Sequence, residues 1–291
     1  MESNSNQQNQ QNQLNQLNQL NQVNQSGILD KQKDLAVPAK STQSSINLNE
    51  IVESCLLAGK IMLQSGAETY RVEDTMMRMA AACGFGNSHS YVTPTGIIFA
   101  ADQMESTRII RITERSTDLQ KVAMVNSVSR RITSGEITIQ EANKLLMKID
   151  ATKHAYTIYT QIAAAAISSA CFLIMFKGSW ADFLPALITG GLGFIFFIYF
   201  TRLVNIKFFA EFLSSFLIGI LAVMFVKTGW GQEVDKIIIG SVMPLVPGLL
   251  ITNAVRDLMA GHLVSGLSKG AEAFLTAFAI GTGVAVVISF Y

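Results

Sequence analysis

Five long apolar segments in the second part of the sequence restrict the chain to folds that are embedded in a membrane. Each has roughly the 17–25 residues that an α-helix needs to cross the hydrocarbon core of a bilayer. Lipid offers no hydrogen-bond partner to backbone N–H and C=O groups, so these segments are expected to be helical. The expected spans are 157–176, 183–200, 208–226, 237–255 and 271–290. We therefore predict an α-helical integral membrane protein with five transmembrane helices in residues 153–291.

The fourth of these segments is interrupted at its centre by Pro244, Pro247 and Gly248. Each proline removes a backbone donor and crowds the carbonyl one turn back. The polar residues that follow are Asn253, Arg256 and Asp257. Broken helices at membrane depth are used by transporters to aim helix ends at a small polar solute. We predict that these six residues form a substrate pathway; a proline kink that only shapes packing is the alternative.

Three carboxylates in or beside the spans are candidates for proton coupling. Asp257 is the first, because an ionisable group near membrane depth is a functional hypothesis by default. Glu211 and Glu272 lie at the ends of two other apolar segments. Each of these two either reaches the cytoplasmic interface or faces a polar pathway and exchanges a proton.

The charges between the spans predict the orientation, since cytoplasmic loops favour Lys and Arg. The charged residues expected at one side of the membrane are all basic: Lys153, Arg202, Lys207, Arg256 and Lys269. The other side mixes both signs: Lys177, Lys227 and Lys236 with Asp182, Glu233 and Asp235. The first residues also lack the basic start and apolar core of a signal peptide. We predict a cytoplasmic amino terminus and an external Tyr291.

The sequence before the spans divides into two parts. Residues 1–45 begin with an almost pure Asn/Gln tract and continue as a linker that contains Lys, Ser and Pro. Such a composition buries too little apolar surface to fold, so this part is expected to be a disordered tail. Residues 46–152 are predicted to be a small cytoplasmic α+β module. It has helices that end at Gly66 and Gly84, strands at 90–100 and 107–113, and two further helices at 119–132 and 138–149.

The module contains a polar motif at the start of its second helix. The motif residues are Ser65, Gly66, Glu68, Arg71 and Glu73, followed by Thr95 and Gly96 between β-type residues. Carboxylates and a guanidinium at a helix start can bind a substrate or serve acid/base chemistry. The stronger interpretation is structural, because acidic residues suit the helix dipole and Arg71 can pair with Glu68. No nucleophile–base pair accompanies them, so no catalytic residue is predicted.

Composition excludes several other classes of protein. The formal net charge of +1 and the lack of a basic stripe give no case for nucleic-acid binding. Cys55, Cys83 and Cys171 form no CxxC pair and are odd in number. They are expected to be reduced, buried thiols, and no metal or cofactor is predicted.

The two motifs together resemble those of the threonine/serine exporter family. The resemblance rests on residues 65–73 with 93–96, and on residues 244–248 continuing through Asn253, Asp257, Gly261 and Gly266. It implies an exporter in the bacterial cytoplasmic membrane, for threonine and serine or for a dicarboxylate such as succinate. Five spans after the module resemble the larger subunit of the family's split form, which implies a small companion membrane subunit. The module of the family has been likened to a hydrolase, but no activity is carried over here.

Two other functions and one assembly stay open at this point. The spans could anchor an enzyme that acts through the soluble module, or the chain could be a membrane sensor or scaffold in which the region of Gly248 only packs. A homo-oligomer is also an open alternative. The lipid bilayer is an expected partner in each case.

Cysteine labelling in intact cells tests the predicted orientation. In a variant without the natural cysteines, a membrane-impermeant thiol reagent should modify Tyr291→Cys and leave Ser45→Cys and Thr133→Cys unmodified until the cells are opened. Modification of Ser45→Cys in intact cells would overturn the orientation.

Overall fold

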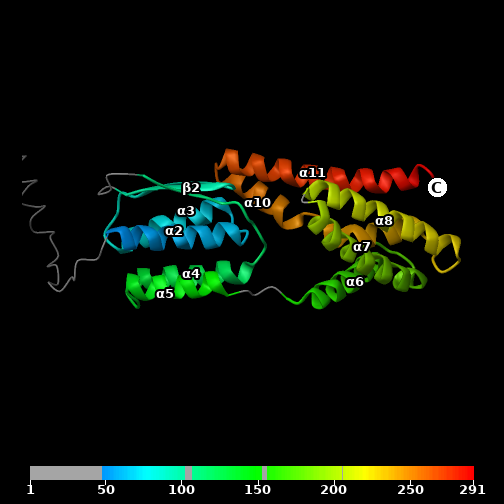
Figure 1. Ribbon diagram of the computed structural model, residues 1–291, viewed down its shortest axis with the longest axis horizontal. Helices are drawn as coiled ribbons and strands as arrows, with labels where there is room; N and C mark the ends of the chain where they lie inside the picture. Colours follow the sequence, from blue (N-terminus) through cyan, green and yellow to red (C-terminus); the bar gives the residue numbers. More distant parts are fainter. Residues whose placement is uncertain (1–47, 102–106, 153–155, 205) are drawn as a thin grey trace, which may run out of the picture. The chain divides into compact units, whose positions relative to one another are not determined.

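The computed structural model describes residues 48–101, 107–152, 156–204 and 206–291, and residues 48–291 form one compact unit. The expected disordered tail, 1–45, lies outside the described residues. The described part is mostly helical, with one three-stranded sheet near its beginning (Figure 1).

Residues 48–151 form four helices and an antiparallel sheet of strand order β1-β2-β3. The elements are α2 (Leu48–Gln64), α3 (Thr69–Ala82), β1 (His89–Thr93), β2 (Gly96–Ala100), β3 (Arg108–Arg111), α4 (Leu119–Thr133) and α5 (Ile139–Ala151). α2 and α3 lie between the sheet and the pair α4–α5 (Figure 1). The expected helices are therefore present, with ends that shift by a few residues.

One expected strand is wrong, because residues 90–100 form two strands instead of one. Thr93 pairs with Gly96 across a tight turn, so that β1 and β2 make a hairpin around Pro94. Proline has no N–H to donate to a ladder, which is why the strand ends there. The reversal places Val92 opposite Ile97, both facing the core.

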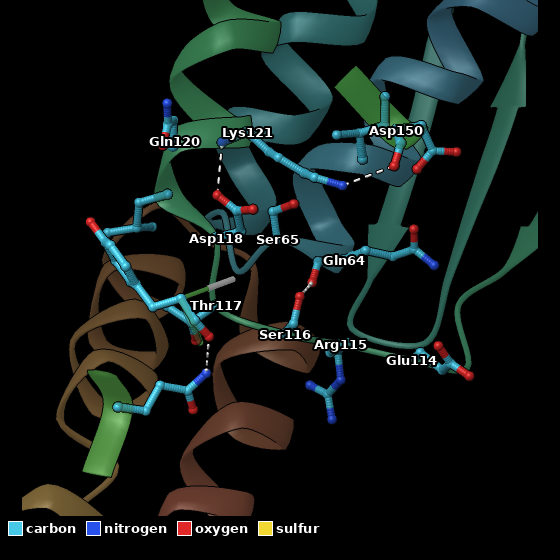
Figure 2. Close-up of a pocket in the computed structure, with 14 residues that line it drawn as sticks. Gln64, Ser65, Glu114, Arg115, Ser116, Thr117, Asp118, Gln120, Lys121 and Asp150 are labelled. Carbon is cyan, nitrogen blue, oxygen red and sulfur yellow. Dashed lines mark hydrogen bonds between the residues drawn. The ribbon is translucent and has the colours of Figure 1, made fainter. Parts of the chain in front are cut away.

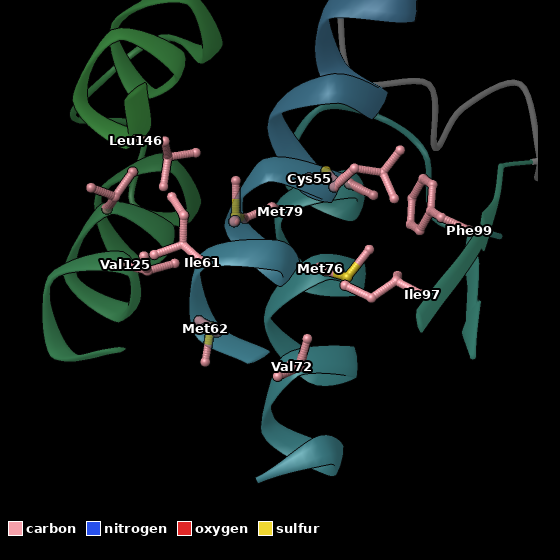
Figure 3. Close-up of a cluster of buried hydrophobic side chains, with 14 of the residues drawn as sticks. Cys55, Ile61, Met62, Val72, Met76, Met79, Ile97, Phe99, Val125 and Leu146 are labelled. Carbon is pink, nitrogen blue, oxygen red and sulfur yellow. The ribbon is translucent and has the colours of Figure 1, made fainter. Parts of the chain in front are cut away.

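The core of this part consists of apolar side chains from all four helices and the sheet. Ile97 and Phe99 alternate with the exposed Ile98 along β2, so one face of the sheet covers α2 and α3. Figure 3 shows the cluster, in which Met76 lies beside Ile97. Gly59 of α2 faces Met76, where an added Cβ would overlap the sulfur, so α2 and α3 pack at close range.

Residues 158–288 contain four helices that are long and apolar enough to cross a membrane: α6 (Ile158–Met175), α7 (Phe183–Val204, preceded by the short η1, Trp180–Asp182), α8 (Lys207–Lys227) and α11 (Leu263–Ile288). The expected fourth span is instead a helix pair. α9 (Val234–Val242) and the short η2 (Met243–Leu245) meet α10 (Gly248–Met259) at a bend of 60°. Counted as one broken span, the pair brings the total to the five that the sequence predicts.

Helices in this half approach one another closely where small residues face a neighbour. An added Cβ at Gly240 of α9 would lie 2.8 Å from the carbonyl oxygen of Ser169 in α6. The expected small residues Gly190, Gly191 and Gly193 all face α6 or α8 in the same way. Close backbone approach of this kind is how helices associate in lipid, where apolar side chains gain nothing from leaving it.

The three cysteines differ more than the sequence suggests. Cys55 is fully buried between helices, and burial, with Cys83 nearby, raises the pKa of its thiol to about 12. Cys83 is half-buried, and burial raises the pKa of this thiol as well. Cys171 is exposed on α6, so the expectation of a buried thiol is wrong there. A helix that is apolar on every side can expose a thiol to lipid, and its sequence has no periodic pattern that shows which face is exposed.

A pair of glycines in α11 tests the packing against α8. A Cβ at Gly283 would overlap the hydroxyl of Ser215 and lie 2.5 Å from the carbonyl oxygen of Phe212, whereas a Cβ at Gly281 would meet nothing within 4 Å. Gly283→Ala should therefore destabilise the protein by about 1–3 kcal/mol. Gly281→Ala, the matched control, should unfold at the wild-type temperature in detergent. Equal unfolding temperatures for the two variants would contradict this packing.

Candidate functional site

The broken span leaves backbone donors without partners at the start of α10. At the break, the Val246 N–H donates to the Met243 carbonyl at 3.2 Å, and the Gly248 N–H donates to the Val246 carbonyl at 2.9 Å. The N–H groups of Leu249 and Leu250 have no acceptor among the residues that the structure describes. These donors belong to the positive end of the α10 dipole, which attracts anions.

A cavity of about 300 Å³ lies beside this break. Its walls combine the turn from Val246 to Leu250 with backbone of the module and with polar side chains of several elements. The polar side chains that line it are Arg115, Ser116, Thr117, Lys207, Asn253, Lys269 and Glu272. Three of these residues are basic and one is acidic, so the cavity suits a small anionic or zwitterionic solute.

The polar motif of the module lies against α10. Asn253 donates to the Gly66 carbonyl at 2.8 Å, and Arg256 donates to the Glu68 carboxylate at 2.5 Å. Gly66 has a positive φ of 87°, which turns the chain at the end of α2 and presents this carbonyl. Two motifs far apart in sequence are thus one site.

Asp257 is the centre of this contact. It is fully buried, and it accepts hydrogen bonds at 2.9 Å from both the backbone N–H and the hydroxyl of Thr69. The ammonium group of Lys269, on α11, lies 2.8 Å from the same carboxylate. Lys269 is also buried, and it donates further to the Thr69 hydroxyl and the Ala67 carbonyl. A buried ion pair is tolerated only with such complete bonding.

The acidic residues of the motif have different surroundings. Burial alone would raise the pKa of Glu68, but its own backbone N–H, Arg256 and Arg71 outweigh burial and hold the pKa below the ordinary value. Arg71 pairs with Glu68 at 3.0 Å, as its spacing predicts. Burial raises the pKa of Glu73 above the ordinary value, although Glu73 accepts a hydrogen bond from the Val92 N–H at 2.8 Å.

The remaining motif residues shape the walls and the turn. The Ser65 carbonyl accepts from the Asp118 N–H at 3.1 Å, which fixes the start of α4 against the end of α2. The Thr95 carbonyl accepts from the Ile112 N–H, and Gly96 begins β2. Neither Thr95 nor Gly96 lines the cavity, but Pro94 beside them does.

The two glutamates expected as proton carriers lie in different places. Glu272 lines the cavity and binds both Arg115 and Lys207. Glu211 is buried between α8 and α11, where one oxygen accepts from Thr276 at 3.3 Å. Its other oxygen has no partner among the described residues.

Of the six residues expected in the substrate pathway, three line the cavity: Pro247, Gly248 and Asn253. Pro244 lies within η2, and Arg256 and Asp257 bind the module instead. Among residues 48–291, leaving out the masked ones, there is no group of three or more His, Cys, Asp or Glu side chains that could hold a metal ion.

A second, larger cavity of about 690 Å³ adjoins the first. Both are lined by Arg115, Ser116 and Thr117, so this segment separates them. Figure 2 shows the larger cavity, with Ser116 against Gln64 and Lys121 reaching the Asp150 carbonyl. The Ser116 N–H donates to the Gln64 carbonyl at 2.7 Å and holds the segment in place.

Sequence comparisons identify the family. The ThrE family model, which describes threonine/serine exporters, matches residues 53–291. The chain belongs to the threonine/serine exporter family. The match includes both the part with the polar motif and all the apolar helices, so this exporter-family chain is a multi-pass membrane protein.

Two kinds of curated relative are similar to this member of the exporter family. A Mycobacterium tuberculosis protein named probable threonine/serine exporter is 23% identical over 80% of this chain and 45% of its own length. The probable succinate transporter subunit YjjP is 22% identical in Klebsiella aerogenes and 23% in Escherichia coli, each over 83% of this chain and 94% of YjjP. This chain thus spans about half of the first relative and nearly all of the second. No solved structure matches.

Sequence reasoning missed several residues of the exporter-family site. Lys269 is predicted only as a loop charge, and Arg115 and Thr69 are given no role. No local pattern marks these residues, because their partners come from distant elements. The one available signal for Lys269 is its position directly before an apolar run, where an unpaired ammonium would be costly.

Removing Lys269 tests the buried pair. Lys269→Met leaves Asp257 buried without its cation, which should destabilise the protein by about 3–5 kcal/mol. Lys236→Met is the control, because Lys236 lies 4.0 Å from the exposed Asp235, in a pair that stabilises little. Thermal unfolding in detergent measures both, and similar losses for the two variants would show that the Asp257 pair is not buried.

Proposed function

We propose that this chain is one subunit of a cytoplasmic-membrane exporter of small carboxylate-bearing metabolites, threonine and serine or a dicarboxylate such as succinate. It works with a small companion membrane subunit. Family membership supports the export, and the extensive match to a relative named a transporter subunit supports the companion. The observation that carries the substrate site is the cavity at the helix break.

In this proposal the cavity binds the substrate through the backbone of the break and through the amide of Asn253. The partnerless N–H groups at the start of α10 attract the carboxylate, as helix amino termini do. Asn253 uses one N–H for the Gly66 carbonyl, which leaves its second N–H and its oxygen for the solute. Arg256 is bound by Glu68 and acts on the position of α10 rather than on the substrate.

The module controls the broken span through the same contacts. Glu68 and Thr69 hold α10 by Arg256 and Asp257, so that a displacement of the module would move the helix that carries the substrate-binding N–H groups. The module, residues 46–152, is proposed to lie in the cytoplasm. It acts as the inner part of the transport path and not as an enzyme.

Proton coupling is proposed for the two buried carboxylates. Asp257 lies in α10 and its cation partner Lys269 lies in α11, so the pair parts when α10 separates from α11. An ionisable group at membrane depth that changes its partner in this way is a candidate proton carrier. Glu211 has an oxygen with no partner in the described residues and stands at the α8–α11 interface.

Replacing the two prolines of the break tests the substrate site. The double variant Pro244→Ala/Pro247→Ala regains backbone donors and should straighten the span, close the cavity and reduce transport to the background of empty vesicles. The protein should become no less stable. The measurement is uptake of labelled serine, threonine and succinate into inverted vesicles, with and without the companion subunit.

A proline in an ordinary helical position serves as the control for this test. Pro185 lies in the first turn of α7, where a missing N–H disturbs no helical bond, so Pro185→Ala should transport at the wild-type rate. If the double variant also transports at that rate, the prolines are packing features and the cavity is not the substrate site.

A further inference from the structure

Two basic side chains at the cavity are bound to one carboxylate of the same chain. The Arg115 guanidinium lies 2.8 Å from one oxygen of Glu272, and the Lys207 ammonium lies 3.0 Å from the other oxygen. The three residues come from separate elements: the segment before α4, the first turn of α8, and α11. All three line the cavity beside the helix break.

We propose that Arg115 and Lys207 join the N–H groups of α10 in binding the carboxylate of the exported solute, and that Glu272 occupies both basic side chains when the cavity is empty. The inference rests on the proposed function and names the groups that select its substrate. Glu272 is then an internal competitor of the substrate, and this replaces the role of proton carrier that its position in the sequence suggests.

The charges of the cavity agree with this assignment. Lys269 is neutralised by Asp257, which leaves Arg115 and Lys207 against the single carboxylate of Glu272. With Asp257 counted, the charged side chains at the cavity sum to one positive charge. An incoming carboxylate completes this balance, and it accepts from the donors of Arg115 and Lys207 that Glu272 occupies in the empty cavity.

The ion pairs are accessible to a solute. The side chains of Arg115, Lys207 and Glu272 are 36%, 47% and 21% exposed. Pairs this exposed stabilise a fold little and exchange partners readily, unlike the buried pair of Asp257 and Lys269. They are therefore suited to bind and release an anion.

Arg115 has a further position that favours a role in selection. It lines the larger cavity (Figure 2), and it also lines the cavity at the break. A solute that moves from the first to the second passes this guanidinium. A carboxylate can bind it with two parallel hydrogen bonds, which an amide or alcohol does not match.

Three substitutions, one expected to lower the Kd and two expected to raise it, distinguish this proposal from a purely structural salt bridge. Glu272→Gln removes the competitor and should lower the apparent Kd for a carboxylate several-fold. Arg115→Gln and Lys207→Gln should each raise it about tenfold, the loss expected for one charge-assisted hydrogen bond. A structural salt bridge predicts that all three variants bind equally well or worse.

The test uses ligand-dependent thermal stabilisation of the full chain purified with its companion subunit. The probes are L-threonine and succinate, with L-threonine amide and succinamide as counterparts that lack the carboxylate. The variants should change the Kd of the carboxylates and leave that of the uncharged succinamide unaltered. Lys148→Gln is the control, because Lys148 is exposed on α5 and is not among the residues that line either cavity.

Each result decides the inference. A lower Kd for carboxylates in Glu272→Gln and a higher Kd in Arg115→Gln and Lys207→Gln support the inference. Arg115→Lys keeps the positive charge and should recover part of the affinity that Arg115→Gln loses. An unchanged or higher Kd in Glu272→Gln overturns it, as does a wild type that neither carboxylate stabilises. Transport by the wild type is measured separately in vesicles. If the wild type transports but the variants bind carboxylates as the wild type does, this inference is wrong and the proposed function is unaffected.

Discussion

The burial of the Asp257 carboxylate is the constraint on which the rest of this structure depends. A charge in that position is tolerated only if its oxygens are fully bonded, and the bonds come from Thr69 in the module and from Lys269 on α11. Both partners must therefore be in place when the chain folds. The hydrogen bonds and the ion pair of Asp257 therefore hold the module against the membrane helices. The pairs Arg256–Glu68 and Asn253–Gly66 add further hydrogen bonds along α10.

The helix break and the docking of the module are connected through α10. Because α10 begins at Gly248 after a 60° bend, the residues of its first turn line a cavity, and its later turns carry the three side chains that hold the module. One short helix thus has an end at the cavity and a side that binds the module. Any movement of the module acts on the end that faces the cavity.

The two ionic groups at this site have different physical characters. Asp257 and Lys269 are buried and mutually dependent, so this pair holds α10 to α11 and parts only when the two helices separate. Glu272, Arg115 and Lys207 are partly exposed and lie on the cavity, which favours exchange with a solute. A transporter needs both kinds of interaction, since it must hold its parts together while it binds and releases its cargo.

The sequence by itself determined the elements that depend on local patterns. The five apolar segments, the break at Pro244 and Pro247, the helix ends at Gly66 and the pairing of Arg71 with Glu68 follow from hydropathy, backbone chemistry and spacing along a helix. The two motifs were also sufficient to indicate the exporter family.

Only the tertiary structure decided what these motifs contact. The distance in sequence between Thr69 and Asp257, or between Arg115 and Glu272, contains no periodic signal, because such pairs depend on how whole helices pack. For the same reason the role of Lys269, the separation of Arg256 from the cavity and the exposure of Cys171 were not predictable. A residue's type limits which partners it needs, but the packing of the chain determines where those partners are.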